Sequence, residues 1–235
     1  MHGSHRVATE NTLFAMPETG IGLFPDVGGS YFLPRCPGAV GRYLALTGAR
    51  LKAADAVYAG VAQFYVPAAR LAELQEALIA APFGDAAHDM VAAVIRRFVS
   101  FAGEPSLARH RTLIDRVFVL PSVEAIVAAL QAEGGGFAAE TLAALQTKSP
   151  TSLKLAHREV GEGATRNFDD CMRMEWRMAS RVIRGHDFYE GTRAVVIDKD
   201  QKPQWRPASL SAVSAADVEA YFAPLPEGDL RYDWE

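Results

Sequence analysis

Residues 16–29 have the sequence MPETGIGLFPDVGG, and this stretch decides the fold that we expect for the whole chain. Its four glycines and two prolines predict a backbone that turns sharply or approaches another group closely. Short apolar stretches at 6–8 and 13–16 precede it and predict two strands joined by a tight turn. Because two short strands are not stable as a sheet by themselves, we expect their pairing partners to be missing from the chain or supplied by another one.

Beyond residue 29 the spacing of apolar residues is helical. Helices are predicted at 38–47, 52–60, 68–81, 86–99, 121–132 and 165–184, with a short one after Ser214. Residues 64–66 predict one further strand. Ser122 and Ser149 stand where N-caps are typical, and Asp187 with Glu190 resembles a capping box. A little β structure at the front is therefore expected to lead into a mainly helical chain.

Composition narrows the class of protein. Hydrophobic residues make up 49% of the 235 residues and charged residues 22%, as in a globular protein with a buried core. The net charge of −4 gives no electrostatic reason to expect nucleic acid or an anionic membrane as a partner. No apolar run approaches the ~20 residues of a membrane span. Neither the two cysteines, Cys36 and Cys171, nor the six histidines have metal-ligand spacing. We therefore expect a cytoplasmic protein without a metal or redox cofactor.

The loop at 16–29 holds two carboxylates, Glu18 and Asp26, with apolar residues between them. A carboxylate among apolar side chains is desolvated, which raises its pKa, and two carboxylates facing one cavity push their pKa values apart. Such a pair suits general acid–base chemistry or nucleophilic attack on an activated acyl group. A structural role is the alternative for each: Asp26 as the N-cap of a following helix, and Glu18 in an ion pair with Arg35 or Arg42.

The same loop resembles an active-site segment of the crotonase (enoyl-CoA hydratase/isomerase) superfamily. In those enzymes a strand ends in a Pro-Glu pair, matched here by Pro17-Glu18, and a Gly-x-x-Pro-x-x-Gly-Gly segment follows, matched by residues 22–29. Enoyl-CoA hydratases usually have glycine at the position of Asp26. The aspartate resembles the 3-hydroxyisobutyryl-CoA hydrolase branch instead. Further stretches that resemble this branch lie at 44–48, 149–154, 184–195, 197–200 and 203–205.

The resemblance implies an α/β fold of the crotonase type. Residues 1–66 would form the C-terminal end of its spiral core, and residues 67–235 a mainly helical region. The implied activity is hydrolysis of a short-chain 3-hydroxyacyl-CoA thioester, such as 3-hydroxyisobutyryl-CoA in valine breakdown. Glu18 and Asp26 are the catalytic and substrate-binding residues that it implies. Phe24 is expected to line the acyl pocket or to be a plain core residue. Coenzyme A enters as part of the substrate, no cofactor is implied, and a homo-oligomer is compatible with the sequence.

One departure from the family pattern concerns the front of the chain. Family members carry a Gly-rich strand-to-helix segment before the residues that match His2 and Gly3, and its N–H groups help to form the oxyanion hole. We therefore expect the chain to be an N-terminally truncated fragment of a longer enzyme. Two alternatives to a hydrolase stay open: an enoyl-CoA hydratase or isomerase on the same fold, and a non-catalytic fragment or pseudoenzyme.

Overall fold

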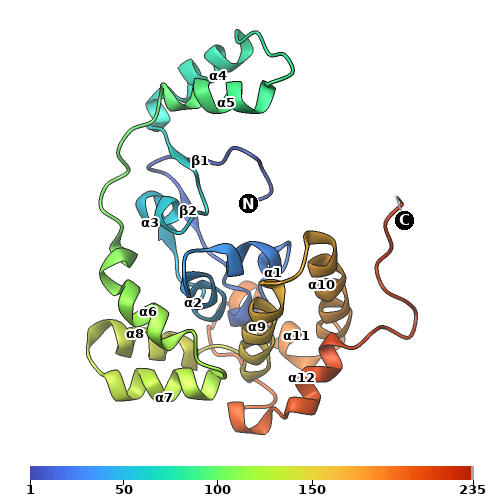
Figure 1. Ribbon diagram of the computed structural model, residues 1–235. Helices are drawn as coiled ribbons and strands as arrows, with labels where there is room; N and C mark the ends of the chain where they lie inside the picture. Colours follow the sequence, from blue (N-terminus) through green and yellow to red (C-terminus); the bar gives the residue numbers. More distant parts are fainter. Residues whose placement is uncertain (234–235) are drawn as a thin grey trace. The chain divides into compact units, whose positions relative to one another are not determined.

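The computed structural model of the protein describes residues 1–233 (Figure 1). Its contacts divide the chain into two compact units, each made of two separate stretches. One unit consists of Met1–Ala15 and Arg50–Arg111, and the other of Met16–Ala49 and the chain from Thr112 onward. The predicted boundary between 1–66 and 67–235 describes the end of a family core, not a compact unit, and stays a prediction.

The first unit contains the β structure, in two separate pairs of strands. β1 (Val7–Ala8) pairs in parallel with β4 (Phe64–Tyr65), and β2 (Leu13–Phe14) pairs in antiparallel fashion with β3 (Leu51–Lys52). The predicted strands are therefore present, but their partners come from the same unit of the same chain. Each of the four strands thus has one partner within the unit, and the expectation that further pairing partners are missing from the chain or supplied by another one stays a prediction.

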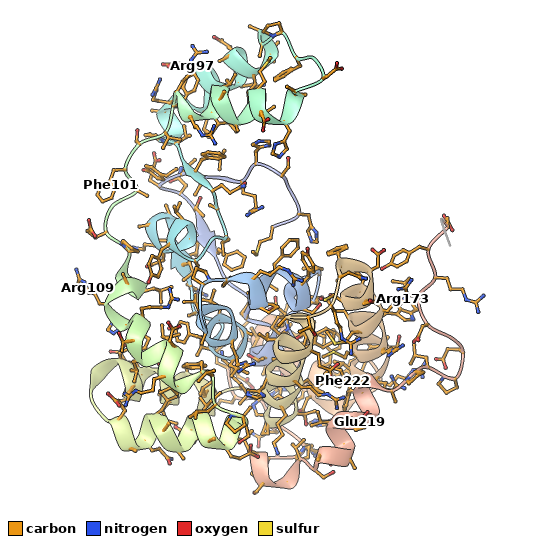
Figure 2. The ribbon with its side chains drawn as sticks, viewed as in Figure 1. Arg97, Phe101, Arg109, Arg173, Glu219 and Phe222 are labelled. Atoms are coloured by element: carbon orange, nitrogen blue, oxygen red, sulfur yellow. The ribbon has the colours of Figure 1, made fainter. Side chains whose placement is uncertain are left out.

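Helices complete the first unit. They are α3 (Ala53–Tyr58), α4 (Leu71–Ile79) and α5 (Ala87–Arg96), with 3-10 turns η3 (Ala68–Arg70) and η4 (Ser106–His110). Figure 1 shows α4 and α5 side by side, and they enclose a small apolar cluster that includes Leu74, Ile95 and Phe98. Phe101, labelled in Figure 2, is 76% exposed in the stretch that follows α5.

The second unit is helical throughout. Its front part holds η1 (Glu18–Ile21), α1 (Gly29–Phe32), η2 (Leu33–Arg35) and α2 (Val40–Thr47). Its later part holds α6 (Arg111–Val117), α7 (Val123–Glu133), α8 (Gly136–Gln146), α9 (Pro150–Gly163), α10 (Phe168–Val182), α11 (His186–Thr192), the π-helical turn η5 (Arg193–Ile197), η6 (Leu210–Ala212) and α12 (Ala215–Phe222). Within residues 1–233, none of the helices combines the length and apolar character that crossing a membrane requires.

Two of the three predicted helix starts are confirmed. The hydroxyls of Ser122 and Ser149 accept hydrogen bonds from backbone N–H groups three residues on, as N-caps do. The capping box predicted at Asp187 is wrong, because α11 already begins at His186 and has Gly185 at its N-cap. The Asp187 carboxylate instead accepts hydrogen bonds from the Ser149 hydroxyl (2.6 Å) and the Arg206 N–H (2.8 Å). The Asp187 carboxylate is thus hydrogen-bonded to residues remote in the sequence and does not cap its own helix.

One apolar cluster of the second unit lies between α9, α10 and α12. It consists of Phe24, Leu155, Met174, Met178, Val182, Val213, Val218 and Phe222. Phe222 and Glu219 both lie on α12 (Figure 2), where the Arg158 guanidinium stacks 4.2 Å from the Phe222 ring and pairs with Glu219 at 2.7 Å. Burial of this cluster fixes α9 and α10, the two helices that cover residues 16–29.

Helix α9 packs so closely against α1 that one position on α9 has no space for a side chain. A Cβ added to Gly163 would lie 1.8 Å from the carbonyl oxygen of Ser30. At Gly161, two residues earlier on the same helix, an added Cβ meets only the end of the Arg42 side chain, at 3.5 Å. The contact between α1 and α9 therefore requires glycine at 163 but not at 161.

This difference is testable with two matched substitutions. Gly163→Ala is expected to lower the free energy of unfolding by ~1–3 kcal/mol, because the backbone of Ser30 must move. Gly161→Ala is expected to raise it by ~0.5–1 kcal/mol, since alanine is the better helix former. Urea denaturation followed by circular dichroism measures both, and equal effects of the two variants would contradict the close contact.

Candidate functional site

Glu18 is the first residue of η1 and follows Pro17 directly. Its side chain is half-buried, and its Oε2 atom is buried without a hydrogen-bond partner. Desolvation raises the pKa of Glu18 to about 7; a hydrogen bond from its own backbone opposes the shift, and the charge of Asp26 adds to it. At neutral pH this carboxyl group is therefore poised between its two protonation states.

Asp26 lies at the other end of the same loop and is also half-buried. Burial raises its pKa. The alternative that Asp26 caps the following helix is wrong, because α1 begins at Gly29 with Gly28 at its N-cap and no capping side chain. The two predicted carboxylates thus lie close enough for one charge to shift the pKa of the other, as the sequence led us to expect.

The ion pair considered for Glu18 does not form between the described residues. Arg35 donates instead to the carbonyl oxygens of Tyr31, Gly163 and Arg166. Arg42 donates to the carbonyl oxygen of Phe118 and has a buried Nε without a partner. No cation therefore lowers the pKa of Glu18, and the effect of desolvation dominates.

Phe24 is fully buried in the apolar core between α9, α10 and α12. This packing is that of a core residue. It holds the middle of the loop between Glu18 and Asp26 in place, whereas a role in lining an acyl pocket stays a prediction.

Two further carboxylates were not singled out from the sequence. Glu175 on α10 is 6% exposed, and its oxygens accept hydrogen bonds from the N–H groups of Gly28 (3.0 Å) and Ser30 (3.1 Å) and from the Ser30 hydroxyl. The signal for it was its place on the apolar stripe of α10, between Cys171 and Met178, where a carboxylate must be buried.

Glu159 on α9 is the second of them and is fully buried. Neither of its carboxylate oxygens has a hydrogen-bond partner. Its pKa is raised well above the ordinary value, first by desolvation and then by the negative charges of Glu175, Asp26, Cys171 and Glu18. An ionised carboxylate without a partner is very unfavourable in a protein interior, so Glu159 is the neutral member of this group of acids.

We name Glu18, Asp26, Glu159 and Glu175 the acid cluster. The loop at residues 16–29 supplies the two half-buried members, and α9 and α10 supply the two buried ones. Different environments push the pKa values of such groups apart, so one carboxyl can hold a proton while another accepts hydrogen bonds as an anion. Between residues 1 and 233, no group of three or more histidine, cysteine, aspartate or glutamate side chains is placed to hold a metal ion.

The protonation of Glu159 predicts how stability depends on pH. Because its pKa is raised in the folded state, the folded chain binds this proton more tightly than the unfolded chain. The stabilisation of the folded state by this proton is complete below the unfolded pKa of ~4.3. It is lost as the pH rises toward the pKa of Glu159 in the folded state. Glu159→Gln removes this loss. The free energy of unfolding of the unmodified chain, relative to the variant, is expected to fall by up to about 1.4 kcal/mol per pH unit as the pH rises above the unfolded pKa.

Urea denaturation at a series of pH values measures this difference. Glu140→Gln is the matched control, because Glu140 is exposed on α8. A difference between the chain and the Glu159 variant that does not change with pH would contradict a neutral, buried Glu159.

Comparison with known proteins supplies a context for the acid cluster. The family model described as enoyl-CoA hydratase/isomerase matches residues 1–222. Among curated relatives, the mitochondrial 3-hydroxyisobutyryl-CoA hydrolase of Gallus gallus is 47% identical over 234 residues, and that of Homo sapiens is 44% identical over 237 residues. These matches cover 98% and 99% of this chain, but 61% of each relative. The chain thus spans about three fifths of the length of these relatives.

Solved structures agree on the fold. A carnitinyl-CoA dehydratase from Mycobacterium thermoresistibile superposes with a TM-score of 0.86 at 39% identity, covering 97% of this chain and 64% of that protein. An enoyl-CoA hydratase from Rhodobacter sphaeroides 2.4.1 superposes with a TM-score of 0.84 at 35% identity, covering 98% and 65%. The crotonase-type fold predicted from the loop at 16–29 is therefore confirmed, and the chain belongs to the enoyl-CoA hydratase/isomerase family.

Proposed function

We propose that this chain carries the acid/base residues of an acyl-CoA thioesterase that hydrolyses a short 3-hydroxyacyl-CoA, such as 3-hydroxyisobutyryl-CoA, to the hydroxy acid and free coenzyme A. The observation that carries this proposal is Glu18, whose partly buried carboxyl has an unpartnered oxygen and a pKa of about 7. Support also comes from the relatives, which are named 3-hydroxyisobutyryl-CoA hydrolase at 44–47% identity.

In the proposed reaction the Glu18 carboxylate acts at the thioester carbonyl. As a general base it takes a proton from water, the water oxygen bonds to the carbonyl carbon, and the C–S bond breaks as the thiolate leaves and is protonated. As a nucleophile it forms a mixed anhydride with loss of the thiolate, and water then cleaves the anhydride. Both routes require ionised Glu18. Asp26 holds the substrate hydroxyl or orients the water, since its carboxylate lies near Glu18 and accepts hydrogen bonds.

A rival function has an observation of its own. Two solved structures that superpose on this chain are named as a dehydratase and a hydratase, and Glu18 is equally suited to move a proton in the addition of water to an enoyl thioester. The presence of aspartate at position 26, where hydratases of the family usually have glycine, favours the hydrolase. A non-catalytic role is the third candidate, and it predicts that no acyl-CoA is turned over in any context.

Substitution of Glu18 tests the proposal. We suggest a chimera in which this chain replaces the matching segment of the Gallus gallus relative, assayed beside the chain alone. Glu18→Gln in the chimera is expected to lower the release of coenzyme A by ~10²–10⁴-fold, because the group that attacks or deprotonates water is lost. In the unmodified chimera, kcat/KM is expected to fall about tenfold per pH unit below pH 7, as Glu18 is protonated with a pKa of about 7.

Thiol release measured with a chromogenic disulfide reports both quantities, and Glu140→Gln, remote on the surface of α8, is the control. Near-normal release by the Glu18 variant would remove Glu18 from the mechanism. A chimera that releases no coenzyme A, while the relative does, would favour the non-catalytic role.

Substitution of Asp26 separates the hydrolase from its rival. Asp26→Gly and Asp26→Ala in the chimera are expected to lower hydrolysis of the 3-hydroxyacyl thioester by at least ~10-fold, since a hydrogen-bond partner of the substrate or water is lost. Neither variant is expected to hydrate an enoyl-CoA, which is followed by the absorbance of the conjugated thioester. The appearance of hydration in the glycine variant would instead establish the rival function, and the alanine variant controls for added backbone freedom.

A further inference from the structure

The turn that follows Asp26 has an unfavourable backbone conformation. Val27 has φ of 49° and Gly28 has φ of 91°, so two consecutive residues adopt the left-handed region. Glycine adopts this conformation freely, whereas a β-branched residue such as valine rarely does. The side chain of Val27 is 66% exposed, so burial of an apolar group does not explain its conformation. Such a conformation persists only where surrounding contacts enforce it.

Glu175 supplies contacts of this kind from a different element. Its two carboxylate oxygens accept hydrogen bonds from the N–H groups of Gly28 (3.0 Å) and Ser30 (3.1 Å), and one of them also from the Ser30 hydroxyl. All three donors belong to Gly28 and Ser30, which are 147 and 145 residues away from Glu175 along the chain. Hydrogen bonds to an ionised acceptor are about twice as strong as those between neutral groups.

Ser30 is also held from its other side. It is fully buried, and its carbonyl oxygen fills the space that a side chain at Gly163 of α9 would need. The turn therefore lies between α9, which contacts its main chain, and α10, which carries Glu175. The titratable groups that interact with Glu175 include Glu159, which is buried without a partner, together with Asp26, Cys171 and Tyr232.

We propose that Glu175 is a positioning residue. Through the N–H groups of Gly28 and Ser30 it holds the turn at Val27 and Gly28, and it thereby fixes the backbone from which Asp26 projects toward Glu18. The holding of the turn does not depend on the proposed function, whereas its effect on turnover rests on that function. Glu175 acts through Asp26 and touches no substrate. The local hydrogen bond from the Gly29 N–H to the Asp26 carbonyl oxygen (2.9 Å) closes the same turn, and Glu175 adds the contacts that come from another element.

The first measurement is hydrogen exchange of the amides of Gly28 and Ser30, resolved by NMR. In Glu175→Gln the amide side chain cannot accept all three hydrogen bonds, so at least one of these amides is expected to exchange ~10-fold or more faster. The matched control is Asp55→Asn in the other unit. Asp55 is also a buried carboxylate, and it accepts hydrogen bonds from the Ser106 hydroxyl (2.6 Å) and the Leu107 N–H (2.8 Å). This control is expected to leave exchange at Gly28 and Ser30 unchanged.

The second measurement is the titration of the Asp26 carboxyl carbon by NMR. Ser30→Ala removes one contact to the turn and leaves the Glu175 carboxyl group in place. Because the Ser30 hydroxyl lowers the pKa of Glu175, the titration of Glu175 is followed in the same experiment. A change in the pKa of Asp26 at pH values where Glu175 stays ionised therefore reports a change of position and not the loss of a neighbouring charge. The pKa, raised by burial in the unmodified chain, is expected to fall toward its ordinary value as the turn opens to solvent. A purely structural Ser30 would leave this titration unmoved.

The outcomes separate this proposal from the proposed function. Faster exchange with an altered Asp26 titration supports positioning, even if the chimera releases no coenzyme A. If the chimera is active, kcat is expected to fall in Glu175→Gln and to stay unchanged in Asp55→Asn. Unchanged exchange and unchanged titration in folded Glu175→Gln and Ser30→Ala would overturn the proposal. Should Glu175→Gln not fold, Ser30→Ala decides by the same two measurements.

Discussion

The close approach of α9 to α1 is the constraint on which the candidate site depends. Gly163 lets the carbonyl oxygen of Ser30 reach the surface of α9. The segment that ends in α1 thereby packs against α9 and α10. Water is excluded from carboxylates that would otherwise be solvated, so each member of the acid cluster has a raised pKa. The chemistry available to Glu18 is thus a consequence of helix packing, since desolvation is the largest cause of its raised pKa.

Burial alone would raise all four pKa values without assigning roles, and hydrogen bonding makes the distinction. Three hydrogen bonds to Glu175 oppose the desolvation that raises its pKa, whereas Glu159 has no partner to oppose desolvation and is stabilised in its neutral form. Glu18, half-buried with one unpartnered oxygen, lies between these extremes at about 7. A gradient of solvation from the interior to the loop therefore sets which acid can exchange a proton with a bound molecule.

Much of this could be predicted from the sequence, and the failures have physical causes. The strands and most helices follow local apolar spacing, and the acid pair follows from one loop. The partners of β1 and β2 could not be predicted, because two-residue strands carry no pairing signal over several dozen intervening residues. The capping box at Asp187 was wrong because the Ser149 hydroxyl, remote in sequence, offered a better partner. Glu159 and Glu175 were missed since acids on helices are usually exposed.

Three departures from ordinary packing lie in the loop at residues 16–29 and on α9. Glu18 and Glu159 have buried oxygens without partners, and Val27 adopts a left-handed backbone. The buried carboxylate of the other unit, Asp55, has both oxygens hydrogen-bonded. Unpaired buried acids lower stability, and a sequence under no other constraint would lose them by a single substitution to an amide or an apolar residue. The unpaired oxygens of Glu18 and Glu159 therefore support the proposal that the acid cluster serves chemistry.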